Sequence, residues 1–396
     1  MNIKYNKLFL LKKKLIFLNH GSFGACPKIV FKSYQNWQLK LENQPVKFLD
    51  QSRDFNKHMK YTRTFLAKEL NVNPNDLVGV VNATAGLNAV AQSVFLNKGD
   101  EILTSDHEYG ALEKTWKYVA KARKAKIKIV KISLPLISEN QFVKSFTSKM
   151  NKKTKILFIS HISSPTALIF PIKKLIKECK KRGIISIIDG AHAPGHIKLN
   201  IKDLNADYYS GNCHKWMMAP KGSAFLWANK DKKNILEPLV ISHGWLPNNY
   251  KVKQKGEFSK DRFVDSFEVQ GTRDPSAWMA IPDAIKFIKN KKYIKVFKDS
   301  SKLAFETAST ISKLTKIPLL ANKDFLAPQM ISIPVPNCNV DNLKQQLMSK
   351  FNIEIPVFKW KNQCFVRISI QIYNTKKDAD TLIKALKAIF KFKHIK

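Results

Sequence analysis

Short apolar runs alternate with amphipathic stretches between residues 77 and 227, and this alternation constrains the fold more than any other feature. The runs that fit β-strands are residues 77–81, 126–132, 155–160, 184–188 and 223–227. Between them, residues 85–95 place apolar side chains on one helical face, and residues 172–182 fit a second helix that stops at Gly183. Strands that alternate with helices are typical of a mostly parallel sheet covered by helices, so we predict a large α/β domain.

The pattern changes after a polar, turn-rich stretch at residues 247–261. The elements expected beyond it are helices at residues 275–290 and 293–313, strands at 330–335 and 364–370, and an amphipathic helix at 378–390. They predict a second, smaller α+β domain, and 396 residues are enough for two domains.

The predicted division of the chain has three parts. Residues 1–30 form an N-terminal arm, residues 31–262 a large α/β domain and residues 263–396 a small C-terminal α+β domain. We find no internal repeat and no low-complexity segment in the sequence.

The chain is strongly basic, with 69 Lys and Arg against 30 Asp and Glu and a formal net charge of +39. Dense positive charge attracts polyanions such as nucleic acids and anionic membranes. Here the lysines are spread along the whole chain, and no basic block is interleaved with aromatic platforms for stacking bases. We therefore expect a solvated basic surface and no nucleic-acid partner.

The cysteines and the N-terminus bear on the compartment. The five cysteines are odd in number and widely spaced, with no paired metal-ligand or redox spacing, which suggests a reducing compartment, no disulfide framework and no metal site. Residues 12–14, all lysine, interrupt the apolar N-terminal run, and no stretch is long and apolar enough to span a membrane. We expect a cytoplasmic protein with no membrane partner.

The most informative segment is a buried-looking strand that ends in Asp189 and is followed by His192. Ligands in open α/β sheets gather at the carboxyl ends of strands, so this position suits a site. An Asp that caps the following turn is the ordinary alternative, and it is the better interpretation of this segment taken alone.

A lysine further along changes that balance. Lys215 lies in an Asn-Cys-His-Lys-Trp segment at residues 212–216, and Pro-Lys-Gly follows at residues 220–222. One lysine means little in so lysine-rich a chain. A strand ending in Asp-x-x-His, then Asn-x-His-Lys, then Pro-Lys-Gly in this order is far more specific.

With these motifs the chain resembles the class V aminotransferase family of pyridoxal 5'-phosphate (PLP) enzymes of fold type I, and its isopenicillin N epimerase-like branch most closely. The segments that carry the resemblance are residues 17–24, 82–88, 106–110, 160–167, 189–192, 212–216, 270–273 and 366–369. They run in family order over nearly the whole chain. The resemblance implies a mostly parallel seven-stranded sheet, a smaller α+β C-terminal domain, PLP as cofactor, and a homodimer with the active site at its interface.

The resemblance assigns the catalytic residues. PLP is an electron sink whose ring must stay protonated, and Asp189 would hold the ring nitrogen while His192 contacts the phenolic oxygen. Lys215 would hold PLP as a Schiff base and then move the α-proton, and both roles need an unprotonated amine. The ordinary alternatives are a turn or core histidine at His192 and a surface lysine at Lys215.

The resemblance also assigns the remaining cofactor contacts. A strand turns into a helix at residues 82–84, where backbone N–H groups and the helix dipole favour an anion. The residues implied at the phosphate are Ala83, Thr84, Asn212 and His214, with Thr272 reaching the phosphate of a neighbouring subunit. Tyr109 would stack on the ring. The alternatives are an N-cap role for Thr84 and simple packing for Tyr109.

The substrate of such an enzyme brings an α-carboxylate, and Arg367 matches the arginine that binds it in the family through a planar, permanently charged fork. A structural Arg–Asp pair is the alternative at this position. Asn19, His20 and Gly21 would close over the substrate from the N-terminal arm. Cys364 lies in an apolar, strand-like run, which fits a buried thiol and disfavours a cysteine-persulfide desulfurase.

These residues serve epimerisation, transamination and β-elimination alike, so they do not select the reaction. We predict a PLP enzyme resembling isopenicillin N epimerase that acts on an amino acid or a small peptide-like amine. A class V aminotransferase or a C–S lyase of the cysteine sulfoxide type is the enzymatic alternative. A basic nucleic-acid-binding protein with a vestigial PLP fold is the non-enzymatic alternative.

Overall fold

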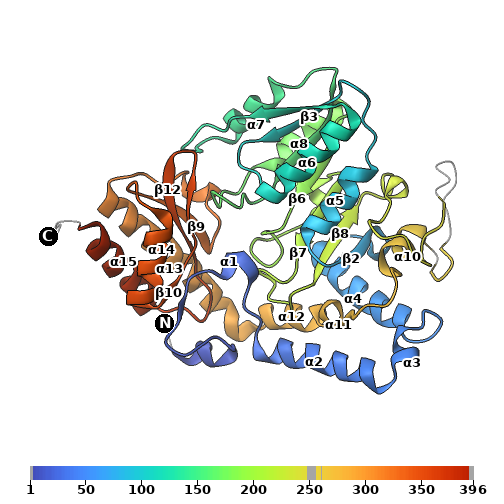
Figure 1. The fold of residues 1–396 in the computed structure, drawn as a ribbon, viewed down its shortest axis with the longest axis horizontal. Coiled ribbons are helices and arrows are strands. Elements are labelled where there is room, and N and C mark those ends of the chain that lie inside the picture. Colours follow the sequence, from blue (N-terminus) through green and yellow to red (C-terminus); the bar gives the residue numbers. More distant parts are fainter. Residues whose placement is uncertain (1–2, 248–255, 260, 392–396) are drawn as a thin grey trace.

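A seven-stranded sheet forms the centre of the computed structural model, which describes residues 3–247, 256–259 and 261–391 (Figure 1). Its strand order is β2-β8-β7-β6-β5-β3-β4. The strands are β2 (Leu77–Val80), β3 (Glu101–Ser105), β4 (Lys126–Val130), β5 (Thr154–Ser160), β6 (Ile185–Asp189), β7 (Tyr208–Asn212) and β8 (Ala224–Ala228). Strand β8 runs antiparallel to β7 and β2, and the other neighbouring pairs are parallel. The predicted mostly parallel seven-stranded sheet is confirmed.

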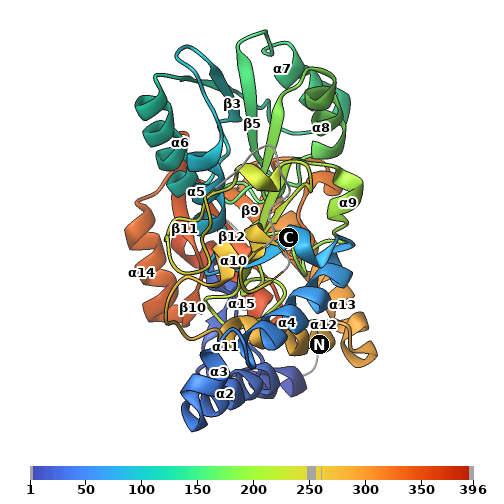
Figure 2. The ribbon, with the colours of Figure 1, turned by 90° about the vertical axis from the view of Figure 1, so that its right-hand side faces the viewer.

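Helices cover both faces of this sheet, as Figure 2 shows. In β5, Ile156 and Phe158 join a buried cluster with side chains of α5 (Ala83–Ser93) and α6 (Gly110–Arg123). The alternate residues Leu157 and Ile159 join the cluster that contains the buried side of α8 (Ile172–Lys181). Because successive side chains of a strand point to opposite faces, a strand that is buried on both sides is apolar throughout. This explains the continuous apolar runs in the sequence.

The five expected strands of the large domain all form, within one or two residues of the predicted bounds. Strands β3 and β7 were not among them. Strand β3 begins with Glu101 and ends with Ser105, and β7 ends in Ser-Gly-Asn at residues 210–212, so neither forms a long apolar run. The connections also contain α7 (Glu139–Thr147) and α9 (Ile201–Leu204).

The N-terminal helices and the segment after β8 pack together on one side of the large domain. They are α2 (Lys28–Asn43), α3 (Pro45–Leu49), α4 (Phe55–Leu70), α10 (Arg262–Glu268), α11 (Ser276–Met279) and α12 (Ile281–Ile288). Helices α11 and α12 contact α2 and α4. The helix predicted at residues 275–290 is wrong as a single element, because it is divided at Ala280 and restarts with Pro282 in its first turn.

The C-terminal part contains an antiparallel sheet of order β11-β12-β9, formed by β9 (Met330–Val335), β11 (Val357–Trp360) and β12 (Gln363–Ser369). Helices α13 (Lys291–Thr315), α14 (Val340–Phe351) and α15 (Lys376–Phe390) accompany it (Figure 1). The arm joins this part, since β1 (Ile16–Phe17) pairs with β10 (Ile353–Glu354). The smaller α+β domain is confirmed, while the boundaries at residues 30 and 262 stay predictions.

The described residues contain no candidate membrane span and no candidate metal cluster. None of their helices is long and apolar enough to cross a membrane. No cluster of three or more His, Cys, Asp or Glu side chains in the described ranges could hold a metal ion. Of the turn-rich stretch at residues 247–261, residues 248–255 and 260 lie outside the described part of the chain.

Candidate active site

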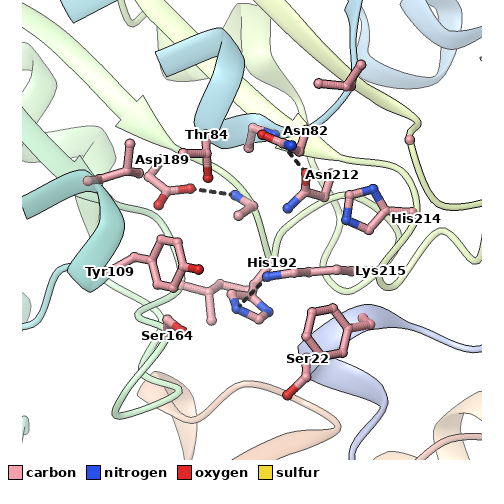
Figure 3. Close-up of a pocket in the computed structure, with 17 residues that line it drawn as sticks. Ser22, Asn82, Thr84, Tyr109, Ser164, Asp189, His192, Asn212, His214 and Lys215 are labelled. Atoms are coloured by element: carbon pink, nitrogen blue, oxygen red, sulfur yellow. Dashed lines mark hydrogen bonds between the residues drawn. The ribbon is translucent and has the colours of Figure 1, made fainter. Parts of the chain in front are cut away.

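A cavity of about 360 Å³ lies at the carboxyl ends of the parallel strands, where open α/β sheets bind ligands. The predicted site residues that line it are Ala83, Thr84, Tyr109, Asp189, His192, Asn212, His214 and Lys215. Figure 3 shows that the labelled residues surround the cavity from several elements. Ser22 of the N-terminal arm and Ser164 also line it. Segments more than a hundred residues apart therefore meet at one site.

Lys215 reaches into the cavity and lies against His192 (Figure 3). The distance between Lys215 Nζ and His192 Nε2 is 3.1 Å. Burial lowers the pKa of Lys215 to about 8; the charge of Asp189 opposes this shift and that of Arg367 adds to it. An amine with this pKa is partly unprotonated at neutral pH, as a nucleophile and a general base both require.

Asp189 ends β6 and faces the same cavity. Its Oδ1 accepts a hydrogen bond of 2.8 Å from the backbone N–H of Ala191. Burial raises the pKa of Asp189, against the effects of that hydrogen bond and of the Lys215 charge. Among the described residues no cation forms an ion pair with this carboxylate. The carboxylate can therefore accept a hydrogen bond from a charged N–H group of a bound molecule.

The start of α5 forms another wall of the cavity. Asn82 is the N-cap of this helix, and its side chain accepts a hydrogen bond from the backbone N–H of Ala85 at 2.8 Å. The alternative that Thr84 caps the helix is therefore wrong. The backbone N–H of Ala83 already donates to Asn212 Oδ1 at 2.8 Å, whereas the Thr84 hydroxyl makes no hydrogen bond to a described residue. Thr84 thus offers a donor at a positive helix end.

His214 lies beside this helix start. Its Nδ1 is 3.0 Å from the carbonyl oxygen of Ser223, which can only accept, so Nδ1 carries the proton. Burial lowers the pKa of His214 to about 4, and the Lys215 charge adds to that shift. A phosphate beside Nε2 would oppose the shift, because it stabilises the protonated ring.

Arg367, on β12, does not line the cavity itself but contacts Ser22 and Ser164, which do. Its Nη1 donates to the Ser164 carbonyl oxygen at 2.5 Å, and its Nη2 donates to Ser22 Oγ at 3.2 Å. Its Nε is buried without a hydrogen-bond partner among the described residues, and none of their carboxylates pairs with the guanidinium. The alternative of a structural Arg–Asp pair is therefore wrong among the described residues. A buried guanidinium with only neutral partners suits an incoming carboxylate.

The arm residues Asn19 and His20 lie behind the cavity wall. Asn19 donates to Glu354 at 3.2 Å and accepts from Ser22 Oγ at 2.5 Å, at the start of α1 (His20–Phe23). His20 lies between the Tyr373 hydroxyl at 2.9 Å and the Lys215 carbonyl oxygen at 3.1 Å. These contacts hold the arm in place.

Gly21 is buried among the small-domain strands, where a Cβ would lie 2.6 Å from Met330 Sδ. The arm residues that do line the cavity are Ser22 and Phe23, which the sequence motif contained but did not single out.

Of the two remaining predicted cofactor contacts, Tyr109 lines the cavity and Thr272 does not. Tyr109 lines the cavity and is 45% exposed at its mouth. Thr272 is exposed and does not line the cavity within one chain. Cys364 is fully buried in β12, which confirms the prediction of a buried thiol.

Glu108 is a buried carboxyl close to the site that the sequence interpretation missed. It accepts hydrogen bonds from the Ser105 hydroxyl and from Ser160, whose N–H lies at 2.9 Å and whose Oγ lies at 2.6 Å. Burial raises the pKa of Glu108 to about 8; the serine hydrogen bonds oppose this shift and the Asp189 charge adds to it. Its place between a strand end and Tyr109 was the only signal in the sequence.

Glu108 is expected to make the fold less stable as pH rises. The unfolded carboxyl releases its proton near its ordinary pKa, whereas the folded one keeps it up to about 8, so stability falls between these values. Glu108→Gln keeps the shape and removes the titration. Its melting temperature should match that of the wild type near pH 5 and exceed it above about pH 8. The exposed Glu113→Gln is the control, and an equal pH dependence in both variants would contradict the assignment.

Comparisons with known proteins agree with this geometry. The family model Aminotransferase class-V matches residues 17–382. The isopenicillin N epimerase of Amycolatopsis lactamdurans is 32% identical over 380 residues, covering 94% of this chain and 95% of that protein. The hercynylcysteine sulfoxide lyase of Schizosaccharomyces pombe is 25% identical, covering 96% of each protein.

A solved structure is similar over the whole chain. The apo cysteine desulfurase of Thermococcus onnurineus NA1 superposes with a TM-score of 0.82 at 21% identity, covering 99% of each chain. This likeness establishes the fold.

The residues present fit PLP. An unpaired Asp189 carboxylate suits a protonated ring nitrogen, the Thr84 hydroxyl at a helix start suits a phosphate, and the Lys215 amine suits an aldehyde carbon. The match of the family model over nearly the whole chain, together with the relative at 32% identity, shows that the chain belongs to the class V aminotransferase family and is an enzyme.

Proposed function

We propose that this protein removes the α-proton of an amino acid or a small peptide-like amine, as an isopenicillin N epimerase-like enzyme with Lys215 as the point of cofactor attachment. Its cofactor is pyridoxal 5'-phosphate. The observation that carries the proposal is the Lys215 amine, whose pKa is lowered to about 8, in one cavity with His192 and Asp189.

The purified protein should be yellow, and borohydride should fix the cofactor on the peptide that contains Lys215. A colourless protein that gains no chromophore when PLP is added would overturn the proposal.

When bound, PLP withdraws the electron pair left on the α-carbon after proton removal. The chain's own residues do the rest. Asp189 would hold a proton on the ring nitrogen, and His192 Nε2–H would donate to a ring oxygen. The Lys215 amine accepts the α-proton, and Arg367 orients the substrate through its carboxylate.

Replacing Arg367 by glutamine should lower kcat/KM for amino acids by about a hundredfold, because a buried charged pair with the substrate carboxylate is lost. The test compares each amino acid with the amine that lacks its carboxylate. Wild type should prefer the amino acid strongly, and Arg367→Gln should treat both alike. A variant that keeps the preference would contradict the assignment, and Arg367→Lys should restore only part of it.

Epimerisation is the lead reaction because of the similarity to isopenicillin N epimerase. C–S lysis is the second candidate, favoured by the similarity to hercynylcysteine sulfoxide lyase and by a cavity whose described lining contains no cysteine. Amino acids screened in deuterated water by NMR separate the reactions. Racemised, labelled substrate indicates epimerisation, a keto acid formed only with an amine acceptor indicates transamination, and pyruvate with a sulfur product indicates lysis.

A homodimer in the cytoplasm completes the proposal. Val81, Tyr109 and Phe23 are exposed at the cavity mouth, where a second subunit would cover them, and Thr272 would then reach the neighbouring site. The five free cysteines fit a reducing compartment. Light scattering of the holoenzyme should give a dimer mass, and a monomeric holoenzyme with full activity would contradict this part.

A further inference from the structure

Trp216, the residue after the attachment lysine, is held rigidly in the core. It is 1% exposed and stacks on His196 with ring centroids 3.7 Å apart and planes at 9°. The ring of His20 lies 5.0 Å from it on a tilted plane. Its indole Nε1–H donates to His192 Nδ1 at 3.3 Å. Trp216 is thus hydrogen-bonded to His192 and directly follows Lys215 in the chain.

The indole contact determines where His192 carries its proton. An indole nitrogen only donates, so His192 Nδ1 must accept, and in a neutral imidazole the proton then lies on Nε2. That Nε2–H points at Lys215 Nζ, 3.1 Å away, and needs a lone pair there. An ammonium group has no lone pair, so this arrangement of hydrogen bonds requires Lys215 to be the free amine.

His196 is itself fixed, so Trp216 cannot turn away. His196 Nε2 accepts from the backbone N–H of Gln329 at 3.2 Å, which places its own proton on Nδ1. That Nδ1–H donates to the carbonyl oxygen of His192 at 3.2 Å. One side chain therefore supports the indole plane and also anchors the backbone of His192.

The charges around His192 and Lys215 explain why the hydrogen bond from Trp216 matters. Burial lowers the pKa of His192 well below its usual value, and the positive charges of Lys215 and Arg367 and the neighbouring rings of His196 and His214 act in the same direction. For Lys215, burial and Arg367 favour the free amine, but the Asp189 charge favours the ammonium. The His192 Nε2–H, which needs a lone pair on Lys215 Nζ, also disfavours the ammonium and so offsets the effect of Asp189.

We propose that Trp216 is a positioning residue that fixes His192 in its Nε2-protonated form and thereby keeps Lys215 an unprotonated amine. The inference rests on the proposed role of Lys215 in cofactor attachment. It adds a residue that touches neither cofactor nor substrate in that proposal.

Trp216→Phe keeps the ring stack and removes the N–H donor. His192 Nδ1 can then take the proton, and Nε2 becomes an acceptor that stabilises the Lys215 ammonium. The pKa of Lys215 should rise by about one unit, the size of one hydrogen bond. The measurement is pulse labelling of full-length cofactor-free protein with acetic anhydride over a pH series, read by mass spectrometry on the Lys215 peptide. The half-labelling pH of Lys221 serves as internal reference.

Trp116→Phe is the matched control. Trp116 is 2% exposed, and its buried Nε1 has no hydrogen-bond partner in the described part of the chain. The substitution therefore removes the same atoms without breaking a hydrogen bond. Its Lys215 labelling midpoint should equal that of the wild type. An unchanged midpoint in Trp216→Phe, or equal shifts in both variants, would overturn the proposal.

If Trp216→Phe does not fold, ¹⁵N NMR of histidine-labelled wild type decides. The ring of His192, assigned with a His192→Gln variant, should be neutral with its proton on Nε2. A proton on Nδ1 or a doubly protonated ring would overturn the inference. Failure of the proposed function is seen separately, since borohydride would then leave the Lys215 peptide unmodified while the labelling midpoints still report on Trp216.

Discussion

Replacing Lys215 by alanine is expected to abolish borohydride-fixable cofactor and to lower turnover by at least about a thousandfold, because one amine both anchors the cofactor and moves the proton. The fold should survive, since the side chain of Lys215 forms a hydrogen bond to His192 alone among the described residues. Mass spectrometry after borohydride treatment measures the attachment, and steady-state kinetics measures the turnover.

Lys221→Arg is the control for Lys215→Ala. Lys221 lies six positions further along, its pKa is also lowered by burial, and its Nζ donates to the Gly24 carbonyl oxygen at 2.8 Å. Arginine keeps the donor and removes the amine, so cofactor attachment should be unchanged. Small primary amines added to Lys215→Ala should restore part of the proton transfer. Full attachment in Lys215→Ala would show that another lysine holds the cofactor.

Asp189→Asn is expected to lower turnover by roughly a hundredfold to a thousandfold while leaving cofactor attached, because an amide cannot hold a proton on the ring nitrogen. It should also lower the pKa of Lys215 below about 8, since the Asp189 charge favours the ammonium. The thermal stability of this variant near neutral pH should not fall. Burial raises the pKa of Asp189, so keeping the wild-type carboxyl group ionised lowers stability, and the neutral amide avoids that cost. Single-turnover kinetics measures the turnover, acetic anhydride labelling of Lys215 in the cofactor-free protein measures its pKa, and melting curves measure the stability.

Asp207→Asn provides the reciprocal control. Asp207 is buried beside β7 and accepts hydrogen bonds from Ser186 N–H and Oγ, both at 2.8 Å, without lining the cavity. Its replacement should lower stability and leave turnover of the folded enzyme near wild type. If both variants lost stability and activity in parallel, the specific role of Asp189 would be refuted.

The sequence predicted the residues that stand in motifs at strand ends, because parallel strands bring their carboxyl ends to one edge of the sheet. Asp189, His192 and Lys215 meet in one cavity for this reason. The class of fold followed from the alternation of strands and helices. Strand β3 was missed because its end residues are polar, and whether such residues fit into a sheet depends on their tertiary neighbours.

Roles that depend on three-dimensional neighbours could not be predicted from the sequence. Asn19 and Gly21 stood in a motif, yet they support the arm while Ser22 and Phe23 reach the cavity. Trp216 was noticed as a neighbour of the lysine, but its hydrogen bond to a histidine more than twenty positions earlier has no local signature.

The arm that supports Lys215 has a consequence for biosynthesis. His20 is hydrogen-bonded to Tyr373, the Asn374 side chain donates to the Phe17 carbonyl oxygen, and the Ser369 N–H donates to the Leu18 carbonyl oxygen. Because the ribosome makes the chain from its N-terminus, these partners emerge more than three hundred residues after the arm itself. The sheet can form earlier, but the backbone support of the lysine must wait. A nascent chain that has not yet reached these partners would therefore be a poor acceptor of cofactor.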